Sequence, residues 1–364
     1  MDTDIQSATR SYEAWLARCT PGLVASQLRD KHEMMRADPF VFLRGTYYRW
    51  VQLWEAAAGD LARAPRLLAV GDLHIDSYGT WRDAEGRLCW GIDDFDDACP
   101  LPYTNDLVRW ATSLKISIDE GTSTISLRDG CDAFLERYAA TLRRGGDPFV
   151  LAEGKEQMDK LGITELKPPD DFWRKLNSLP AVRRPVPAAV ARAFRDTLPD
   201  RRLDYRVVRR EAGTGSMGQV RYVAIAEWDG GCVAREAKAL VPPASSWASG
   251  LLGRGQPYYA RALEGAVRAP DPFHRVVGSW LIRRLSPDSN PILVADLPRR
   301  RDESVLLGAM GTEVANVHLG TLRQPRQRGR IVADLRRRPP NWLRRSAKMM
   351  AKIVEREWKE YRDG

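Results

Sequence analysis

Three strand-like runs separated by glycine-rich turns constrain the fold of this chain most strongly. They lie within residues 203–241 and read LDYRVVRREAG, QVRYVAIAEW and CVAREAKALV. Their β-branched and aromatic residues are typical of strands, and Asp229-Gly230-Gly231 is a hairpin connection. GTGSMGQV stands between the first two runs, and the third run carries Lys238. The segment therefore predicts a small antiparallel sheet with a glycine loop between two of its strands.

The glycine loop has the spacing of a phosphate-binding element. Glycines lack side chains, so backbone N–H groups can approach phosphate oxygens closely. A dinucleotide-binding turn would open a helix, with an acidic residue about 20 positions later, whereas a strand follows here. Strand, glycine loop, strand, turn and strand with lysine is the arrangement of protein kinases. The alternative is a glycine-rich hairpin with a surface lysine. The predicted nucleotide-binding residues are Gly213, Thr214, Gly215, Ser216, Gly218, Val220 and Lys238.

Lys238 would pair with the α- and β-phosphates of a nucleotide, supported by a carboxylate from the following helix. Glu264 lies at a suitable place in the chain for this partner. Glu236 is also near, so the sequence leaves the choice between the two open.

An acidic segment precedes the glycine loop by more than a hundred residues. In GIDDFDDA, Asp93, Asp94, Asp96 and Asp97 place four carboxylates in five positions. Such crowding is unfavourable unless a cation compensates it. Mg²⁺ suits the segment, because it takes one or two carboxylates together with substrate phosphates. We expect Asp94 as the metal ligand and Asp96 as its substitute; the alternative is a solvated acidic loop.

A second motif, GDLHIDSYG, follows the strand-like run RLLAV. Asp72 in this motif is placed to accept the proton of an acceptor hydroxyl. His74 is more often structural in such a loop than a metal ligand. Asp106 is expected either to brace the loop by hydrogen bonding or to cap a helix.

These motifs together resemble known families. GDLHIDSYG, IDDFDDA and NDL resemble the HGDxHxxN…IDFxDA…DLA pattern of aminoglycoside phosphotransferases and related small-molecule kinases. The patches DPFVFLRGTYY, DDFDDACPLPYTNDLVRWATSL, GTGSMGQVRY, REAKAL and TEVANVHLGT resemble the bacterial domain-of-unknown-function family 2252, which is grouped with the protein-kinase-like superfamily. The resemblance implies that Asp72 is the catalytic base, with His74 beside it, that Asp94 binds Mg²⁺, and that Lys238 pairs with phosphate.

At Ser77 the chain differs from the family pattern, and at Arg44 it matches a family motif of unknown role. The pattern has asparagine five residues after the catalytic aspartate as a second metal ligand, and this chain has Ser77. A serine hydroxyl is a poorer oxygen donor than an amide carbonyl, so Ser77 bears on the rate of transfer more than on nucleotide binding. Arg44, in FLRG, matches a motif of the family, and the sequence does not indicate what this arginine does.

The predicted fold is α+β, a circularly permuted, two-lobed protein-kinase-like fold. We expect a mainly helical catalytic part over residues 1–200, a nucleotide-binding sheet over 201–290, and a helical part over 291–364 that packs back on the catalytic part. Residues 6–60 are expected to be helical with a break at Asp38-Pro39. The run RLLAV is expected to join LCWGIDDF through a turn at 83–86, and residues 145–200 to form a linker with short helices.

The composition of the chain bears on its possible partners and on its location. The net charge is +9, and arginines are frequent from residue 321 onward. That basic region is expected to be a solvated face; nucleic acid is the weakest of the partner hypotheses. The five scattered cysteines are typical of reduced thiols. No apolar run suggests a signal or a membrane span, so we expect a cytoplasmic protein without a membrane partner.

The sequence thus predicts a phosphotransferase that uses ATP and Mg²⁺ on the hydroxyl of an unknown small molecule or protein. Two alternatives remain. One is a pseudokinase that binds nucleotide without transfer and presents its basic C-terminal surface to a partner. The other is a kinase-fold enzyme that transfers the nucleotide moiety instead of phosphate.

Overall fold

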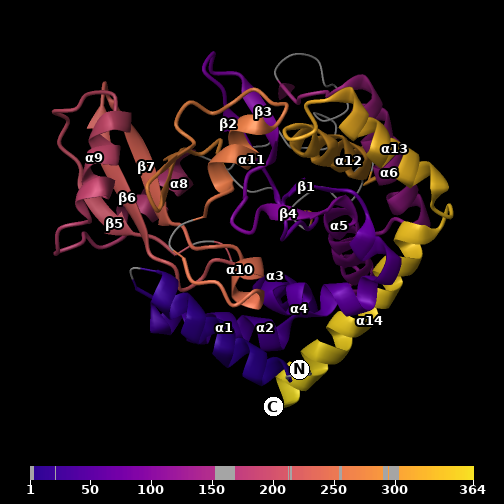
Figure 1. Cartoon of the computed structure of the whole chain (residues 1–364). Coiled ribbons are helices and arrows are strands. Elements are labelled where there is room, and N and C mark those ends of the chain that lie inside the picture. The colour runs from indigo at the N-terminus through magenta and orange to yellow at the C-terminus, as the bar shows by residue number, and fades with distance from the viewer. Residues whose placement is uncertain are drawn as a thin grey trace.

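The protein is a mixed α+β structure with small antiparallel sheets, as expected at this coarse level (Figure 1). The computed structural model describes residues 4–20, 22–151, 169–211, 213, 215–253, 256–289, 294 and 303–364. A helical part and a five-stranded sheet are the two main components (Figure 1). Residues from both line the candidate site.

The chain begins with helices whose boundaries follow local signals. They are α1 (Ile5–Cys19), α2 (Ala25–Ala37), α3 (Pro39–Gly45) and α4 (Tyr47–Ala58), followed by the 3-10 turn η1 (Gly59–Arg63). Asp38 ends α2 and caps α3, because its Oδ1 accepts from the N–H groups of Phe40 and Val41 at 2.7 and 2.9 Å. The predicted break at Asp38-Pro39 is confirmed.

Two short ladders follow, and their pairing differs from the prediction. Strand β1 (Arg66–Ala69) pairs with β4 (Cys99–Pro102), and β2 (Tyr78–Arg82) pairs with β3 (Leu88–Ile92). The turn near Asp83 therefore joins β2 to β3 and does not join RLLAV to LCWGIDDF. Strand β4 was not predicted from the sequence, because CPLP contains two prolines. A β-ladder accepts proline only at an edge strand or at the end of a strand.

Among the described residues, the helical part contains five further helices. They are α5 (Tyr103–Asp119), α6 (Leu127–Arg144), α12 (Glu303–Leu319), α13 (Pro325–Arg337) and α14 (Trp342–Asp363). At Gly311 a Cβ atom would lie 2.2 Å from the carbonyl oxygen of Phe134, so α12 and α6 approach closely. The last helix, α14, packs one face into the core: its buried residues include Leu343, Ala347, Met350, Val354 and Tyr361.

The predicted antiparallel sheet is present and has five strands. They are β5 (Arg206–Arg209), β6 (Arg221–Trp228), β7 (Gly231–Ala239), β8 (Arg275–Val277) and β9 (Trp280–Leu285), in the order β5-β6-β7-β9-β8. Asp229 and Gly230 both have positive φ, 46° and 82°, which matches the two-residue turn between β6 and β7. The short helices α10 (Ala244–Ala248) and α11 (Tyr259–Gly265) follow β7.

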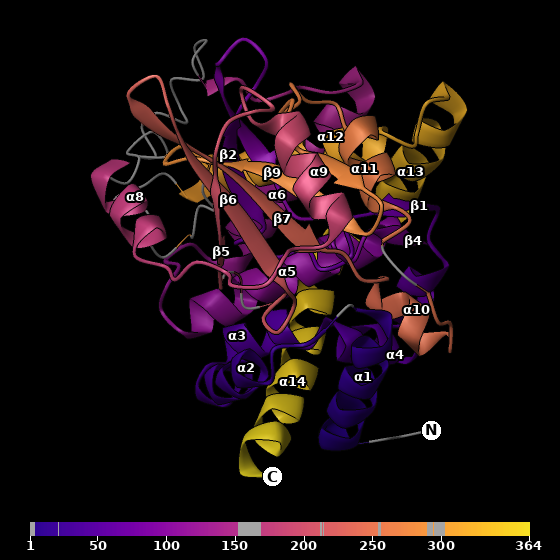
Figure 2. The same cartoon turned by 90° about the vertical axis from the view of Figure 1, so that its left-hand side faces the viewer.

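Two helices before the sheet cover its opposite faces. Helix α9 (Ala188–Thr197) packs Val190 and Phe194 against Tyr222 and Ala224. Helix α8 (Pro169–Asn177) packs Leu176 against the other face of β6, since successive strand residues point to opposite faces. Figure 2 shows α9 lying across the sheet. Both helices therefore pack on the sheet. A division of the chain at residue 200, as expected from the sequence, would assign them to a different part from the strands that they cover.

The two ends of the chain lie together at the base of the helical part (Figure 1). The Gln6 side chain donates to the carbonyl oxygen of Glu360 at 2.8 Å. The Trp358 indole donates to the carbonyl oxygen of Met35 at 3.1 Å. The last helix thus packs against helices from the start of the chain.

All five cysteines are free thiols. Within the described part of the chain, no helix has the length and apolar character needed to cross a membrane.

Candidate active site

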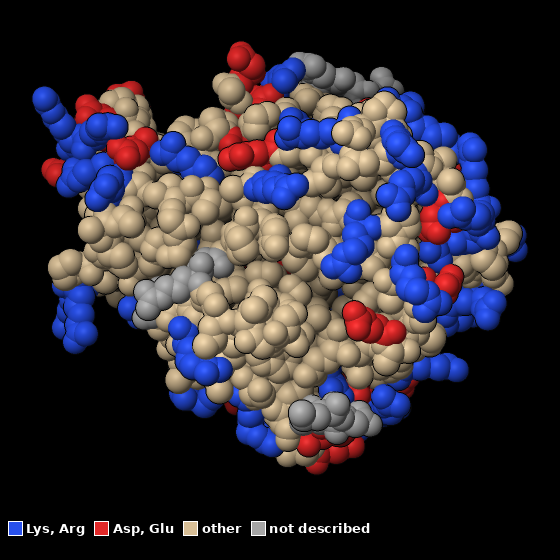
Figure 3. All heavy atoms as spheres, viewed as in Figure 1, with Lys and Arg blue, Asp and Glu red and all other residues tan. Residues whose placement is uncertain are grey.

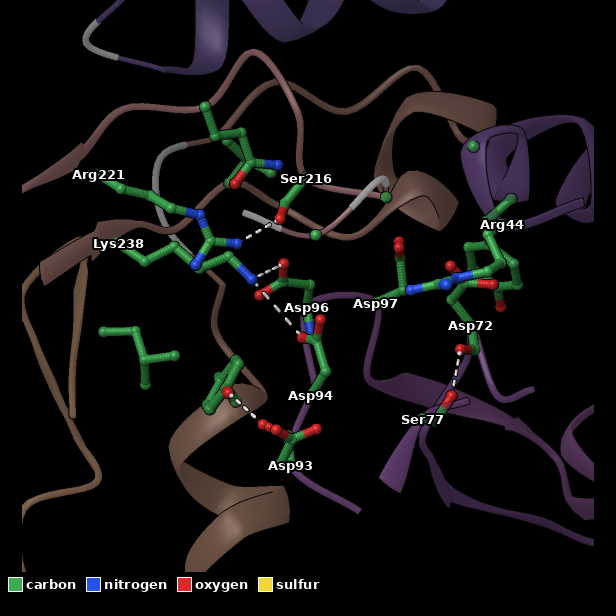
Figure 4. Close-up of a pocket in the computed structure, with 18 of the residues that line it drawn as sticks. Arg44, Asp72, Ser77, Asp93, Asp94, Asp96, Asp97, Ser216, Arg221 and Lys238 are labelled. Carbon is green, nitrogen blue, oxygen red and sulfur yellow. Dashed lines mark hydrogen bonds and ion pairs between the residues drawn. The ribbon is translucent and has the colours of Figure 1, made fainter. Parts of the chain in front are cut away.

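A pocket between the five-stranded sheet and the helical part collects most of the predicted site residues (Figure 4). It is lined by the acidic loop after β3, the loop after β1, the described residues of the glycine loop, and side chains of β6, β7 and α2–α3. The predicted residues that line it are Asp72, His74, Ser77, Asp94, Asp96, Gly213, Gly215, Ser216 and Lys238. Thr214 lies outside the described residues.

Lys238 meets the acidic loop. On β7 its side chain is 4% exposed, and its Nζ forms an ion pair with Asp96 and lies 3.7 Å from Asp94 Oδ1. Lys238 therefore does not pair with Glu264, which is an exposed residue of α11. The carboxylate partner comes from the loop that the sequence assigned to the metal.

Glu236, the other proposed partner of Lys238, holds three arginines instead. It is fully buried and pairs with Arg210, Arg221 and Arg283 at 2.9, 3.1 and 2.7 Å. Burial alone would raise its pKa, but the three guanidinium groups outweigh burial and hold the pKa well below its usual value. Glu236 is therefore ionised and positions cations at the pocket.

The acidic loop is partly buried, and desolvation raises the pKa of Asp93 and of Asp96 to about 6 and that of Asp97 to about 8. Asp94 differs. Burial would raise its pKa too, but Lys238 and the backbone N–H of Asp96 lower it below its usual value. Its side chain is 53% exposed, so Asp94 presents an ionised carboxylate to the pocket.

These residues fit a magnesium ion with phosphate ligands. Asp96 Oδ1 is a buried acceptor without a hydrogen-bond partner, and Asp94 is ionised beside it. Among the described residues no three His, Cys, Asp or Glu side chains are arranged as an all-protein metal site. Mg²⁺ commonly uses one or two carboxylates and completes its shell with phosphates and water. Asp94 and Asp96 match that requirement.

The loop after β1 is held by Asp106. Its carboxylate accepts from the N–H groups of Val70 and Gly71 at 2.7 and 3.0 Å, and from His318 Nε2 at 2.9 Å. Asp106 lies inside α5, so it braces the loop and does not cap the helix. Gly71 has φ of 89°, and a Cβ there would lie 2.3 Å from the carbonyl oxygen of Asp97. Only glycine allows the two loops to meet here.

Asp72 is paired with an arginine that the sequence analysis did not single out. Arg109 Nε donates to Asp72 Oδ1 at 2.8 Å, and its guanidinium stacks on the rings of Tyr47 and Trp50. Burial nevertheless raises the pKa of Asp72, against the effect of Arg109. A carboxylate with a raised pKa is a better proton acceptor, which suits the predicted base.

His74 and Ser77 stabilise the loop itself. His74 is buried, and desolvation holds its pKa well below the usual value, so the ring is neutral. Its Nδ1 accepts from the N–H of Asp76 at 3.2 Å. The Ser77 hydroxyl accepts from the N–H of His74 at 2.9 Å and donates to the carbonyl oxygen of Asp72 at 3.4 Å. Both predicted site residues therefore have structural hydrogen bonds.

The glycine loop is packed against α2. Gly218 has φ of 91°, its N–H donates to Gln27 Oε1 at 3.1 Å, and a Cβ there would lie 2.7 Å from Leu28. Gly215 lies near the loop after β1, since a Cβ there would be 4.0 Å from Asp72 Oδ2. Val220 does not fit its predicted role, because it packs in the apolar cluster under α9, on the sheet face away from Arg221 and Lys238.

Arg221 was also missed, although the sequence held a signal for it. The two-residue turn at Asp229-Gly230 fixes the register of β6 and β7 and places Arg221 directly opposite Lys238. Arg221 donates to Ser216 Oγ of the glycine loop, and its Nε is buried without a partner. The position of Arg109 depends on packing between helices, which the sequence does not reveal.

The basic region after residue 321 forms a surface. Figure 3 shows Lys and Arg side chains gathered on the side of the molecule where α13 and α14 lie. Some of these side chains pair with acidic neighbours: Arg338 lies 2.6 Å from Asp334, and Lys359 lies 2.7 Å from Glu355. This surface contributes no residue to the pocket lining.

Residues 23–178 match the sequence model of a family described as uncharacterized protein conserved in bacteria (DUF2252). The predicted resemblance to this family is confirmed over that range, which carries Asp72 and Asp94 and ends before the glycine loop. No curated protein and no solved structure matches the chain.

Proposed function

We propose that this chain is a kinase-like phosphotransferase that uses ATP and Mg²⁺ and acts on the hydroxyl of an acceptor molecule. The ion pair that Lys238 forms with Asp96, next to Asp94 in the same pocket, carries the proposal. Motifs for the nucleotide, the metal and the base come from separate parts of the chain and line this single cavity. The order of these motifs motivates the proposal of a circularly permuted kinase-like fold.

Each group in the pocket has a role in this proposal. Lys238 and Arg221 would bind the phosphates of the nucleotide under the backbone N–H groups of the glycine loop. Asp94 and Asp96 would hold Mg²⁺, whose charge would offset that of the triphosphate. Asp72 would orient the acceptor hydroxyl, while Arg109 keeps its carboxylate in place.

The transfer itself is a displacement at the γ-phosphorus. The acceptor oxygen forms a bond to the γ-phosphorus, and the bond to the β,γ-bridging oxygen breaks, so that its electron pair leaves with ADP. The proton of the acceptor hydroxyl passes to Asp72, whose raised pKa favours this acceptance.

Replacing Asp94 tests the proposal. Asp94→Ala is expected to abolish transfer of label from γ-labelled ATP, and also the Mg²⁺-dependent part of the thermal stabilisation by ATP. Asp119→Ala, at an exposed aspartate of α5, is the matched control. Transfer or Mg²⁺-dependent stabilisation that persists in Asp94→Ala would refute the metal assignment. Label transferred from α-labelled ATP would identify nucleotidyl transfer instead.

One observation favours a second candidate, a pseudokinase that binds nucleotide without transfer. The Ser77 hydroxyl is already hydrogen bonded to His74 and Asp72 in its own loop, at the position expected to supply a second metal ligand. Under this candidate, ATP stabilises the chain without label transfer, and Ser77→Asn does not change that. Transfer by the natural sequence excludes it. The basic surface of α13 and α14 would then be the partner surface, in a protein we propose to be cytoplasmic.

A further inference from the structure

Two cations line the Asp72 side of the pocket, apart from those on the sheet. Arg44 is in the last turn of α3, and Lys31 is in α2. Figure 4 shows Arg44 beside Asp72 and Asp97, whereas Arg221 and Lys238 lie on the other side of Asp96. The nucleotide role proposed for the sheet cations therefore leaves Arg44 and Lys31 unexplained.

Lys31 is a buried cation with little to neutralise it. It is 7% exposed, and its Nζ donates to the carbonyl oxygen of Gly215 at 3.3 Å. In the described part of the chain, no carboxylate lies within ion-pair distance of this ammonium group. Burying a charge without a close partner is unfavourable, so an anion supplied from outside would be stabilising here.

Arg44 also has unused hydrogen-bonding capacity. Its Nη1 lies 3.5 Å from Asp76 Oδ2, which is long for an arginine–carboxylate pair. The other oxygen of Asp76 accepts from the N–H of Val294 at 3.0 Å. The Arg44 Nε is buried and has no partner. A buried donor without an acceptor is costly, and Arg44 lies where a pocket ligand could supply one.

The nearby carboxylates already have other partners. Asp72 is paired with Arg109, and Asp97 accepts from the N–H of Ala244 at 2.7 Å without an ion pair to either cation. The Lys31 ammonium group is a point charge, and the Arg44 guanidinium group is planar with several N–H donors. Together they suit an anion with several oxygen atoms. Both residues border Gly215: Lys31 through its side chain and Arg44 through its backbone carbonyl.

We propose that Arg44 and Lys31 bind a phosphate group carried by the acceptor, so that the substrate is a phosphorylated molecule with a free hydroxyl at Asp72. This inference rests on the proposed phosphotransferase function. It assigns a role to Arg44. It also gives the acceptor end of the pocket an anion-binding pair, Arg44 and Lys31, that is separate from the cations at the nucleotide end.

The test uses inorganic phosphate as the probe. The full chain is saturated with Mg²⁺ and the non-hydrolysable analogue AMPPNP, which fills the γ-phosphate position, and phosphate is titrated by calorimetry. We expect one saturable phosphate site. Arg44→Gln should weaken it by about tenfold or more, since charge-assisted hydrogen bonds are lost. Arg326→Gln, at an exposed arginine of α13, should leave it unchanged.

Several results would overturn the inference. They are no saturable phosphate site in the loaded chain, equal phosphate affinity in Arg44→Gln, and acetate binding as tightly as phosphate. If Arg44→Gln loses its circular dichroism signal, Arg44→Lys replaces it, because it keeps the charge and removes the fork. Phosphate affinity should then fall by about threefold, and an unchanged affinity also counts against the inference.

Failure of the proposed function can be told apart from failure of this inference. If AMPPNP and Mg²⁺ do not bind the natural sequence, the phosphotransferase proposal falls. Phosphate is then titrated into the nucleotide-free chain, Arg44→Gln and Arg221→Gln. Loss of affinity in Arg44→Gln alone supports an anion site at α2 and α3, whereas loss in Arg221→Gln alone overturns it.

Discussion

Lys238 and Asp96 form an ion pair across the pocket, although 142 positions separate them in the chain. Lys238 belongs to the central strand of the five-stranded sheet, and Asp96 belongs to the loop that follows β3 in the helical part. The pair therefore joins the two main components at the place where the phosphates of a nucleotide are proposed to bind.

Lys238→Met is expected to lower the affinity for ATP and Mg²⁺ by about tenfold or more, since a charge-assisted phosphate contact is removed. Methionine preserves most of the buried aliphatic stem, so the fold should be retained. Isothermal titration with ATP and Mg²⁺ measures the change. Lys359→Met, at an exposed lysine paired with Glu355, is the control. Equal ATP affinity in the natural sequence and Lys238→Met would contradict the assignment of Lys238.

Arg109→Met should decrease the free energy of unfolding by about 3 kcal/mol, because it removes the buried guanidinium that pairs with the partly buried Asp72 carboxylate. Urea denaturation followed by circular dichroism measures this. Arg63→Met, at an exposed arginine paired with Asp60, should change the free energy of unfolding by less than about 1 kcal/mol. A similar effect of both substitutions would show that Arg109 does not stabilise Asp72 as described.

Gln27→Ala should loosen the glycine loop, because Gln27 accepts from the N–H of Gly218 and donates to Glu211 at 2.8 Å. We expect faster hydrogen exchange of the amides of residues 215–219 and a loss of nucleotide affinity of about threefold. Mass spectrometry of exchange measures the first, and titration with ATP the second. Gln52→Ala, at an exposed glutamine of α4, should change neither. Unaltered exchange in Gln27→Ala argues against α2 as a support of the loop.

A pH-dependent term is expected from Glu120, at the end of α5. Burial, with Asp38 as the next cause, raises its pKa from 4.5 to about 7. Between these values the folded chain holds a proton that the unfolded chain has lost. The contribution of Glu120 to stability is therefore complete below pH 4.5 and is lost as the pH rises to about 7.

Glu120→Gln has no such titration. Its stability relative to the natural sequence should increase between pH 4.5 and about 7 and then stay constant. The difference should remain below about 1 kcal/mol, because part of the side chain stays in water. Urea denaturation at a series of pH values measures it. A difference that is independent of pH would refute the raised pKa.

The sheet could be predicted because its signals are local. The turn at Asp229-Gly230 and the alternating residues of β6 specify a hairpin without help from the rest of the chain. Strand β4 was not predicted, because it contains two prolines and its partner strand, β1, is not its neighbour in the chain. Helix α13 lies within the helical part expected over residues 291–364, but its own bounds were not predicted, because it is mostly polar with Ile331 as its buried residue.

The candidate site divides in the same way. Asp72, Asp94 and Lys238, which line one pocket, could be singled out because each stands in a motif with characteristic spacing. Arg109 and Lys31 were not, since their roles arise from helices that meet only in the folded protein. Glu264 was chosen by its position after the lysine strand, but α11 turns its side chain to solvent.

The contact between Gln6 and Glu360 places the two ends within reach of a short peptide linker. A variant with its ends joined, and opened at the exposed turn between Asp200 and Arg201, should keep every contact of the pocket. Its glycine loop and lysine would then precede the base and acidic loops in translation order. The order of these segments along the chain would then be independent of their positions in the pocket. A permutation of the chain during evolution could change that order and leave the pocket as it is.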